Sequence, residues 1–111
     1  MAKRNYFDHV DPEGNGINIL IHEAGYSLNK SWIKNKRNNY FESIGAGNDN
    51  GVSSVKSLIL DKGINPPVHR NHLLGIDEFW SDCYDAGIGF VYSENSDYKS
   101  YIVIIIAKQN Y

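Results

Sequence analysis

YIVIIIA, residues 101–107, is a run of apolar, mostly β-branched residues near the C-terminus of the 111-residue chain. The run is too short to cross a membrane and is typical of a strand that is buried on both faces. Such a strand needs apolar cover on both sides, which places its sheet between two layers of helices. The run therefore predicts an α+β fold, a three-layer α-β-α sandwich around a small, mainly antiparallel sheet.

The segment before this run supplies a partner strand. From Ile88 to Tyr92, large apolar side chains recur at every second position, which is the period of a strand. Residues 93–100 form a polar connector between the two runs, so we expect a β-hairpin. A further short strand is expected near 40–44.

Helix signals lie in the first half of the chain. Apolar residues at helical spacing predict a helix over 16–24, and Gly25 follows where a C-terminal cap belongs. Residues 27–39 are polar and are expected to be irregular. His22 is expected to be an exposed residue of the first helix.

Two further helical segments are expected before the hairpin. Ser53 or Ser54 can cap a helix that ends near 62–63. The two prolines at 66–67 then stop any helix, and residues 69–74 are expected to form one or two short turns.

Composition limits the classes of function. A net charge of −2 gives no long-range field that would attract nucleic acid, so the basic residues of 30–37 are interpreted as a solvated loop. No stretch approaches the roughly 18 apolar residues of a membrane span, and the first residues lack the apolar segment of a signal peptide. The single cysteine, Cys83, lies in no CxxC motif and is expected to be a buried or half-buried thiol.

Five phrases of the sequence, taken together, resemble a known family. They are YFDHVDPEGNGINILIHEAGY (6–26), FESIGAG (41–47), LILDKG (58–63), VHRNHLL (68–74) and AGIGF (86–90) followed by 101–109. In order and spacing they are similar to the CAP superfamily of cysteine-rich secretory proteins, antigen 5 and pathogenesis-related protein 1, above all to its short bacterial members. The chain departs from the family phrases at Phe41, Ser43 and Val68, and its 58–63 phrase lacks the usual tryptophan.

The resemblance implies a cleft lined by two histidines and two acidic residues. By motif position the histidines are His9 and His69, the first acid is Glu42, and Asp61 stands for the second acid. In some family members the imidazoles bind zinc or another divalent metal, so His9 and His69 are the candidate metal ligands and Glu42, Asp61 and Arg70 the candidate ligand-binding residues. Neutral imidazole nitrogens suit zinc, carboxylates can orient the bound water, and open positions would remain for a ligand or solvent.

A purely structural interpretation of the same residues stays open. His9 could donate to a nearby carbonyl, and His69 could anchor its loop through an acidic side chain. Arg70 is expected to tie that loop to acidic side chains, and His72 to lie at the surface or in packing. Three large aromatic residues could line a groove or belong to the core: Tyr26, Trp32 and Trp80.

The family domain opens with helical segments before its first histidine motif, whereas His9 lies close to Met1. We therefore expect residues 1–111 to form a single CAP-like domain that is truncated at its N-terminus. A missing helix would expose apolar surface, which a homodimer could cover.

The resemblance favours an exported, non-enzymatic binding module, located outside the cell or in the periplasm, whose partner is a protein or a small apolar or lipid ligand. Two alternatives stay open. One is a metal-dependent hydrolase with Glu42 as general base, and the other is a truncated domain that acts only by protein–protein contact.

Overall fold

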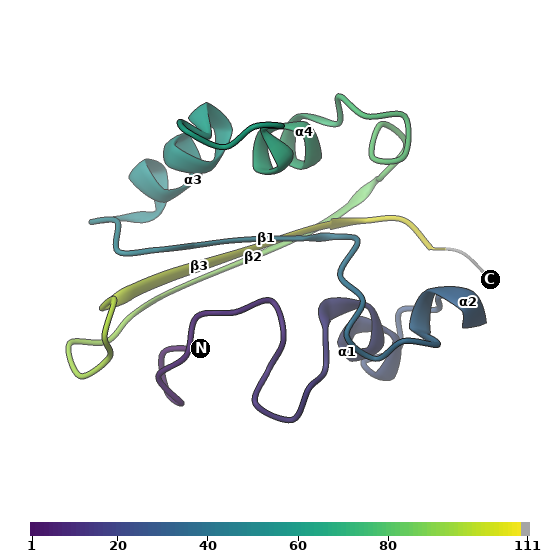
Figure 1. Cartoon of the computed structure of the whole chain (residues 1–111), viewed down its shortest axis with the longest axis horizontal. Helices are drawn as coiled ribbons and strands as arrows, with labels where there is room; N and C mark the ends of the chain where they lie inside the picture. Colours follow the sequence, from purple (N-terminus) through teal and green to yellow (C-terminus); the bar gives the residue numbers. More distant parts are fainter. Residues whose placement is uncertain (110–111) are drawn as a thin grey trace.

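The computed structural model describes residues 1–109 as a small α+β domain. Helices α3 and α4 lie on one side of a sheet, and α1, α2 and the N-terminal segment lie on the other (Figure 1). The predicted α+β class and the antiparallel sheet are confirmed. Within residues 1–109 the elements are α1 (Ile17–Glu23), α2 (Lys30–Ile33), β1 (Glu42–Ala46), α3 (Gly51–Leu60), α4 (Val68–Leu74), β2 (Asp85–Tyr92) and β3 (Ser100–Ala107).

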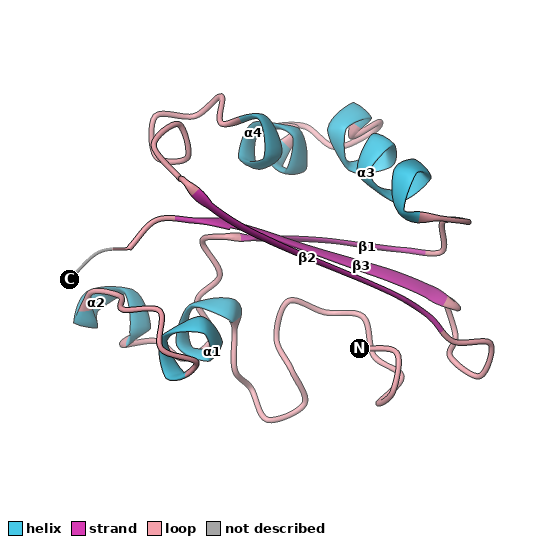
Figure 2. Ribbon diagram, turned by 180° about the vertical axis from the view of Figure 1, so that it is seen from behind, coloured by secondary structure: helices cyan, strands magenta, loops and turns pink. Residues whose placement is uncertain are grey.

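Strand β3, which contains the YIVIIIA run, is the central strand of the order β1-β3-β2. Both of its neighbours are antiparallel to it, and Ile104 is paired with Ser43 of β1 and with Ile88 of β2. Ile102 and Ile104 are only 1% and 3% exposed. The predicted hairpin is confirmed, and the apolar central strand lies between the two groups of helices (Figure 2).

Helix α3 covers the sheet through Leu58, which forms one apolar cluster with Ile102 and Ile104. The helix begins earlier than the serine caps predicted, because Asn50 is its N-cap. The Asn50 side chain accepts the Ser53 backbone N–H at 2.9 Å, and the Asn50 N–H donates to the Ser53 hydroxyl. Asparagine is at least as good a cap as serine, so the first suitable residue begins the helix.

A second apolar cluster lies on the opposite side of the sheet, around Phe41. Phe41 is fully buried and packs with Leu28 and Ala107, and its ring stacks on Phe79 at a centroid distance of 5.9 Å. Trp32 of α2 packs against the same cluster. Strand β1 therefore leaves this cluster at Phe41 and begins at Glu42, two residues later than the expected span of 40–44.

Two expectations about the first half of the chain were wrong. The segment 27–39 was expected to be irregular but contains α2, which Asn29 caps by accepting the Ser31 N–H at 2.8 Å. His22 was expected to be exposed, but it is half-buried because its Nδ1 accepts the Leu28 N–H at 3.2 Å. The expected helix over 16–24 is confirmed as α1, and Gly25 follows it with a φ of 105°.

The N-terminal segment before α1 has no helix or strand but is fixed at several points. Asp11 accepts the backbone N–H groups of Glu13 and Asn15, which closes a polar loop. The Phe7 ring lies 5.4 Å from the Tyr98 ring, beside the hairpin connector. This anchoring brings the segment, with His9 in it, against the edge of β1.

Candidate functional site

His9 and Glu42 form the first polar pair of the candidate site. The His9 Nδ1 lies 2.9 Å from the Glu42 Oε1, and the two side chains are 36% and 10% exposed. An ionised carboxylate can only accept a hydrogen bond, so the His9 Nδ1 carries the hydrogen. The His9 ring is thereby oriented by Glu42 through Nδ1.

Asn39 positions Glu42 at the start of β1. Its side-chain oxygen accepts the Glu42 backbone N–H at 2.9 Å, which fixes the orientation of the amide. The Asn39 amide nitrogen lies 3.0 Å from the His9 Nδ1 and 3.3 Å from the Glu42 carbonyl oxygen. Because the His9 Nδ1 already donates to Glu42, the amide donates to that carbonyl oxygen instead. The sequence analysis did not identify Asn39 as part of the site.

His69 and Asp61 form a second pair of the same type. The His69 Nδ1 lies 2.9 Å from the Asp61 Oδ1, and the Asp61 Oδ2 accepts the His69 backbone N–H at 2.9 Å. Asp61 is the C-cap of α3 and adopts a left-handed backbone conformation, with a φ of 49°. His69 is the second residue of α4, so the pair ties the end of one helix to the start of the next.

The pKa of Asp61 is lowered even though the carboxylate is buried. Burial by itself raises the pKa, but the hydrogen bonds from the His69 ring and backbone and the charge of His69 outweigh it. Asp61 is therefore ionised at neutral pH, and the His69 Nδ1 is the hydrogen-bond donor of the pair.

The His9–Glu42 pair and the His69 ring meet at one small cavity of about 220 Å³. Its lining includes His9, Glu42 and His69, together with Trp80 and His72. The predicted site residues His9, Glu42 and His69 are thus brought together. Within residues 1–109, neither the His9 nor the His69 Nε2 has a protein hydrogen-bond partner.

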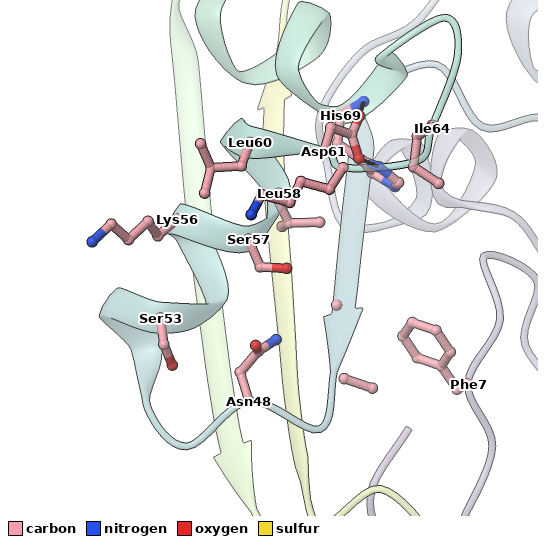
Figure 3. Close-up of a pocket in the computed structure, with 13 residues that line it drawn as sticks. Phe7, Asn48, Ser53, Lys56, Ser57, Leu58, Leu60, Asp61, Ile64 and His69 are labelled. Carbon is pink, nitrogen blue, oxygen red and sulfur yellow. Dashed lines mark hydrogen bonds and ion pairs between the residues drawn. The ribbon is translucent and has the colours of Figure 1, made fainter.

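A second, larger cavity of about 540 Å³ lies on the other side of the His69–Asp61 pair. Figure 3 shows Asp61 and His69 at one end of this cavity, with Leu58 of α3 beside them and Phe7 on the opposite wall. Apolar side chains line much of it, and Lys56 also contributes to the lining. His69 therefore lines both cavities, and Asp61 lines the larger one.

Arg70 does not take part in either cavity. Its Nε donates to the Ile59 carbonyl oxygen at 2.8 Å, and its Nη2 donates to the Leu60 carbonyl oxygen. The expected contact of Arg70 with an acidic side chain is made only by its backbone N–H, which lies 3.5 Å from the Asp61 Oδ2. The guanidinium does not contribute, because the unpaired carbonyl groups at the end of α3 attract it.

The three aromatic residues considered as groove residues have different roles. Trp80 lines the 220 Å³ cavity, and its Nε1 donates to the Tyr40 carbonyl oxygen at 2.8 Å. Trp32 packs against Tyr40 and the Phe41 cluster. The Tyr26 hydroxyl donates to the carboxylate of Asp85, the first residue of β2. Cys83 is half-buried beside the Phe41 cluster, and burial raises the pKa of its thiol.

His72 is a buried polar residue of the site that the sequence analysis treated as surface or packing. It is 3% exposed, and its Nδ1 lies 2.7 Å from the Ser43 hydroxyl. Its Nε2 donates to the Ile106 carbonyl oxygen at 3.1 Å, so the Nδ1 accepts from Ser43. The one signal in the sequence was that Ser43 and His72 both differ from the residues usual in the family whose phrases the sequence resembles.

Burial lowers the pKa of His72 below its usual value, and the nearby charge of His69 adds to this effect. The unfolded chain therefore takes up a proton at higher pH than the folded chain does. We expect the free energy of unfolding to fall as the pH is lowered from about 7 to about 5, since an unperturbed histidine titrates near 6.5.

The variant His72→Gln, whose amide can still donate to Ile106, should show a smaller fall. Urea denaturation of both proteins at the two ends of this pH range measures the difference. An equal fall in both proteins would show that His72 is not the residue responsible.

Within residues 1–109 no group of three or more His, Cys, Asp and Glu side chains is arranged to hold a metal ion. His9, Glu42, Asp61 and His69 therefore do not form such a group. In the same part of the chain, no helix has the length and apolar character needed to span a membrane.

Comparisons of the chain with models of protein families, with curated proteins and with solved structures found no match.

Proposed function

We propose that this domain is a non-enzymatic, CAP-like binding module that uses the cavity between His9 and His69 to bind a divalent metal ion and, through it, a polar ligand. One observation carries the proposal. Each imidazole donates its Nδ1–H to a buried carboxylate, Glu42 or Asp61, and both rings line the same cavity.

This arrangement has the chemistry of a metal-binding histidine. Metal-bound imidazoles commonly donate their second ring nitrogen to a carboxylate, which fixes the tautomer and makes the ligating nitrogen more basic. Here the carboxylates hold Nδ1, so Nε2 of His9 and of His69 would be the ligating atoms. Zinc would supply a Lewis-acidic centre with open coordination positions for water or a ligand.

Two protein ligands bind zinc more weakly than the four of a closed site. Within residues 1–109 no group of three or more His, Cys, Asp and Glu side chains is arranged to hold a metal, so a bound ligand or water would have to complete the coordination. We therefore propose a site of modest affinity, which a partner molecule strengthens by contributing a further donor atom.

The geometry favours binding over hydrolysis. A metal-dependent hydrolase on this site would use Glu42 as general base, but its Oε1 already accepts the His9 Nδ1–H at 2.9 Å. Glu42 is thus better placed to orient His9 than to take a proton from water. The alternative, hydrolysis of an ester or amide with zinc present, would be seen as turnover that Glu42→Gln removes.

The same proposal includes a three-layer α-β-α fold and export of the protein from the cell. The helices on both sides of β3 support the three-layer sandwich of the CAP family, and the resemblance carries the expectation of an exported protein. The 540 Å³ cavity beside His69, with Leu58 and Phe7 in its lining, is the proposed place for a small apolar or lipid ligand.

Zinc titration of the metal-free protein by isothermal calorimetry tests the proposal. We expect one zinc ion per chain at pH 7.5, and weaker binding at pH 5.5 because protons compete for the imidazole nitrogens. Binding that is absent at pH 7.5, or equally strong at both pH values, would contradict it.

A further inference from the structure

Within residues 1–109, β2 is an edge strand whose outer edge pairs with no other strand. In the sheet order β1-β3-β2 it has β3 on one side only, and all eight of its residues are exposed. Its large side chains are exposed on both faces of the sheet. They are Ile88 (68%), Phe90 (38%), Val91 (53%) and Tyr92 (57%).

Nothing within β2 protects this edge. Edge strands of natural proteins usually carry a lysine, a proline, a bulge or covering structure that prevents pairing with another strand. The residues of β2 include no lysine or proline, and its register with β3 runs without a bulge from Asp85 to Tyr92. A long, apolar edge of this kind is suited to pairing with a further strand.

The direction of the peptide groups shows which residues would make that pairing. The Ser93 N–H donates to the Lys99 carbonyl oxygen, so the peptide groups of Ser93 point toward β3. Peptide groups alternate in direction along a strand. The backbone N–H and C=O of the even-numbered residues, Ile88 and Phe90 among them, therefore point away from β3 and toward the free edge.

We infer that a second copy of this chain pairs with β2, in an antiparallel register that places Gly89 opposite Gly89 of the other copy. In this register Ile88 lies opposite Phe90, and Gly87 lies opposite Val91. The apolar Ile88 and Phe90 thus pack against each other, the small Gly87 faces the larger Val91, and the outward peptide groups of Ile88 and Phe90 face each other. A two-fold axis through Gly89 makes the contact self-complementary.

The charges near β2 fit the same register. Asp85, the charged residue of the strand, lies opposite the uncharged Ser93, so no like charges oppose each other along the seam. Antiparallel pairing of the two copies of β2 would join their two three-stranded sheets into one six-stranded sheet.

Apolar grooves beside β2 provide additional surface for this contact. On the face covered by α3, a groove of about 690 Å³ is lined by Val52, Ile59, Ile88 and Phe90. On the other face, a groove of about 250 Å³ includes Gly87 in its lining. A second strand along the edge would bring its own Ile88 and Phe90 to the mouth of the larger groove. This inference does not depend on metal binding.

Cysteine cross-linking tests the register directly. We expect Gly89→Cys, made in a Cys83→Ser background, to form a covalent dimer on mild oxidation, because the two Gly89 residues face each other across the axis. Gly87→Cys in the same background is the matched control, since Gly87 faces Val91. A Cβ at either glycine meets nothing within 4 Å, so both variants can fold.

Sedimentation equilibrium tests the dimer without a cross-link. Ile88→Lys is expected to raise the dimer dissociation constant about tenfold or more, since one poorly solvated charge at the centre of an interface costs over 1 kcal/mol. Ile76→Lys, at a residue that is 60% exposed after α4, should leave it unchanged. A wild-type protein that stays monomeric at all concentrations would overturn the inference. Equal cross-linking of Gly87→Cys and Gly89→Cys would overturn the register.

Discussion

Asp61→Ala is expected to lower the free energy of unfolding by about 3 kcal/mol, because it removes three contributions at once. The carboxylate is 3% exposed, and it accepts both the His69 backbone N–H and the His69 Nδ1–H. Without the carboxylate, the His69 backbone N–H at the start of α4 is poorly solvated and has no hydrogen-bond acceptor. Alanine also tolerates the left-handed conformation of residue 61 poorly.

Asp61→Asn is the matched control for this variant. Asparagine tolerates the left-handed conformation and can still accept a hydrogen bond from the His69 backbone N–H, so about half of the loss is expected. Urea denaturation at neutral pH measures both variants. Equal stability of the wild type and Asp61→Ala would show that the Asp61–His69 pair does not hold α3 and α4 together.

His9→Asn and His69→Asn are each expected to weaken zinc binding at least about a hundredfold, since loss of an outer partner alone usually costs 10–100-fold. An asparagine side chain reaches the position of the Nδ1 and can still donate to Glu42 or Asp61. It has no atom at the position of Nε2. Each variant therefore removes the proposed ligating nitrogen and keeps the hydrogen bond that supports the fold.

His22→Asn is the control for these two variants. Its side-chain oxygen can replace the Nδ1 that accepts the Leu28 N–H, and His22 does not line the cavity. Zinc calorimetry should give the wild-type affinity for His22→Asn. Glu42→Gln should fall between the wild type and His9→Asn, because glutamine orients His9 without the carboxylate charge. A similar zinc affinity in all five proteins would place the metal elsewhere.

Local patterns in the sequence predicted the hairpin and α1 because their signals are contained within a few neighbouring residues. The strand from Ile88 to Tyr92 and the apolar run at 101–107 are joined by a short polar connector, which leaves few other pairings. The polar segment that contains α2 was missed because Trp32 and Ile33 are its main apolar residues. Their packing against the distant Phe41 cluster stabilises the helix.

The candidate site was predicted only in part. Motif positions brought His9, Glu42 and His69 together, and the structure places all three at one cavity. The roles of Asn39 and His72 could not be predicted, because each depends on hydrogen bonds between residues that the fold brings together. His72, for example, meets Ser43 and Ile106 only after α4 has packed against the sheet.

The sequence pattern also could not predict that β2 lies at an exposed edge of the sheet. Alternation of apolar side chains indicates a strand, but it does not say which strand lies at the edge of the sheet. Only the order β1-β3-β2 shows that Ile88 and Phe90 lie on an edge strand.

Long-range ¹H–¹⁵N NMR of the imidazole rings, recorded during a zinc titration, tests the central claim most directly. Before zinc is added, His9 and His69 should both carry their hydrogen on Nδ1. On addition of zinc, the Nε2 signals of both rings should shift with the same dependence on zinc concentration, while that of His22, outside the cavity, stays in place. A shift of one ring alone, or of neither, would contradict a shared metal site between His9 and His69.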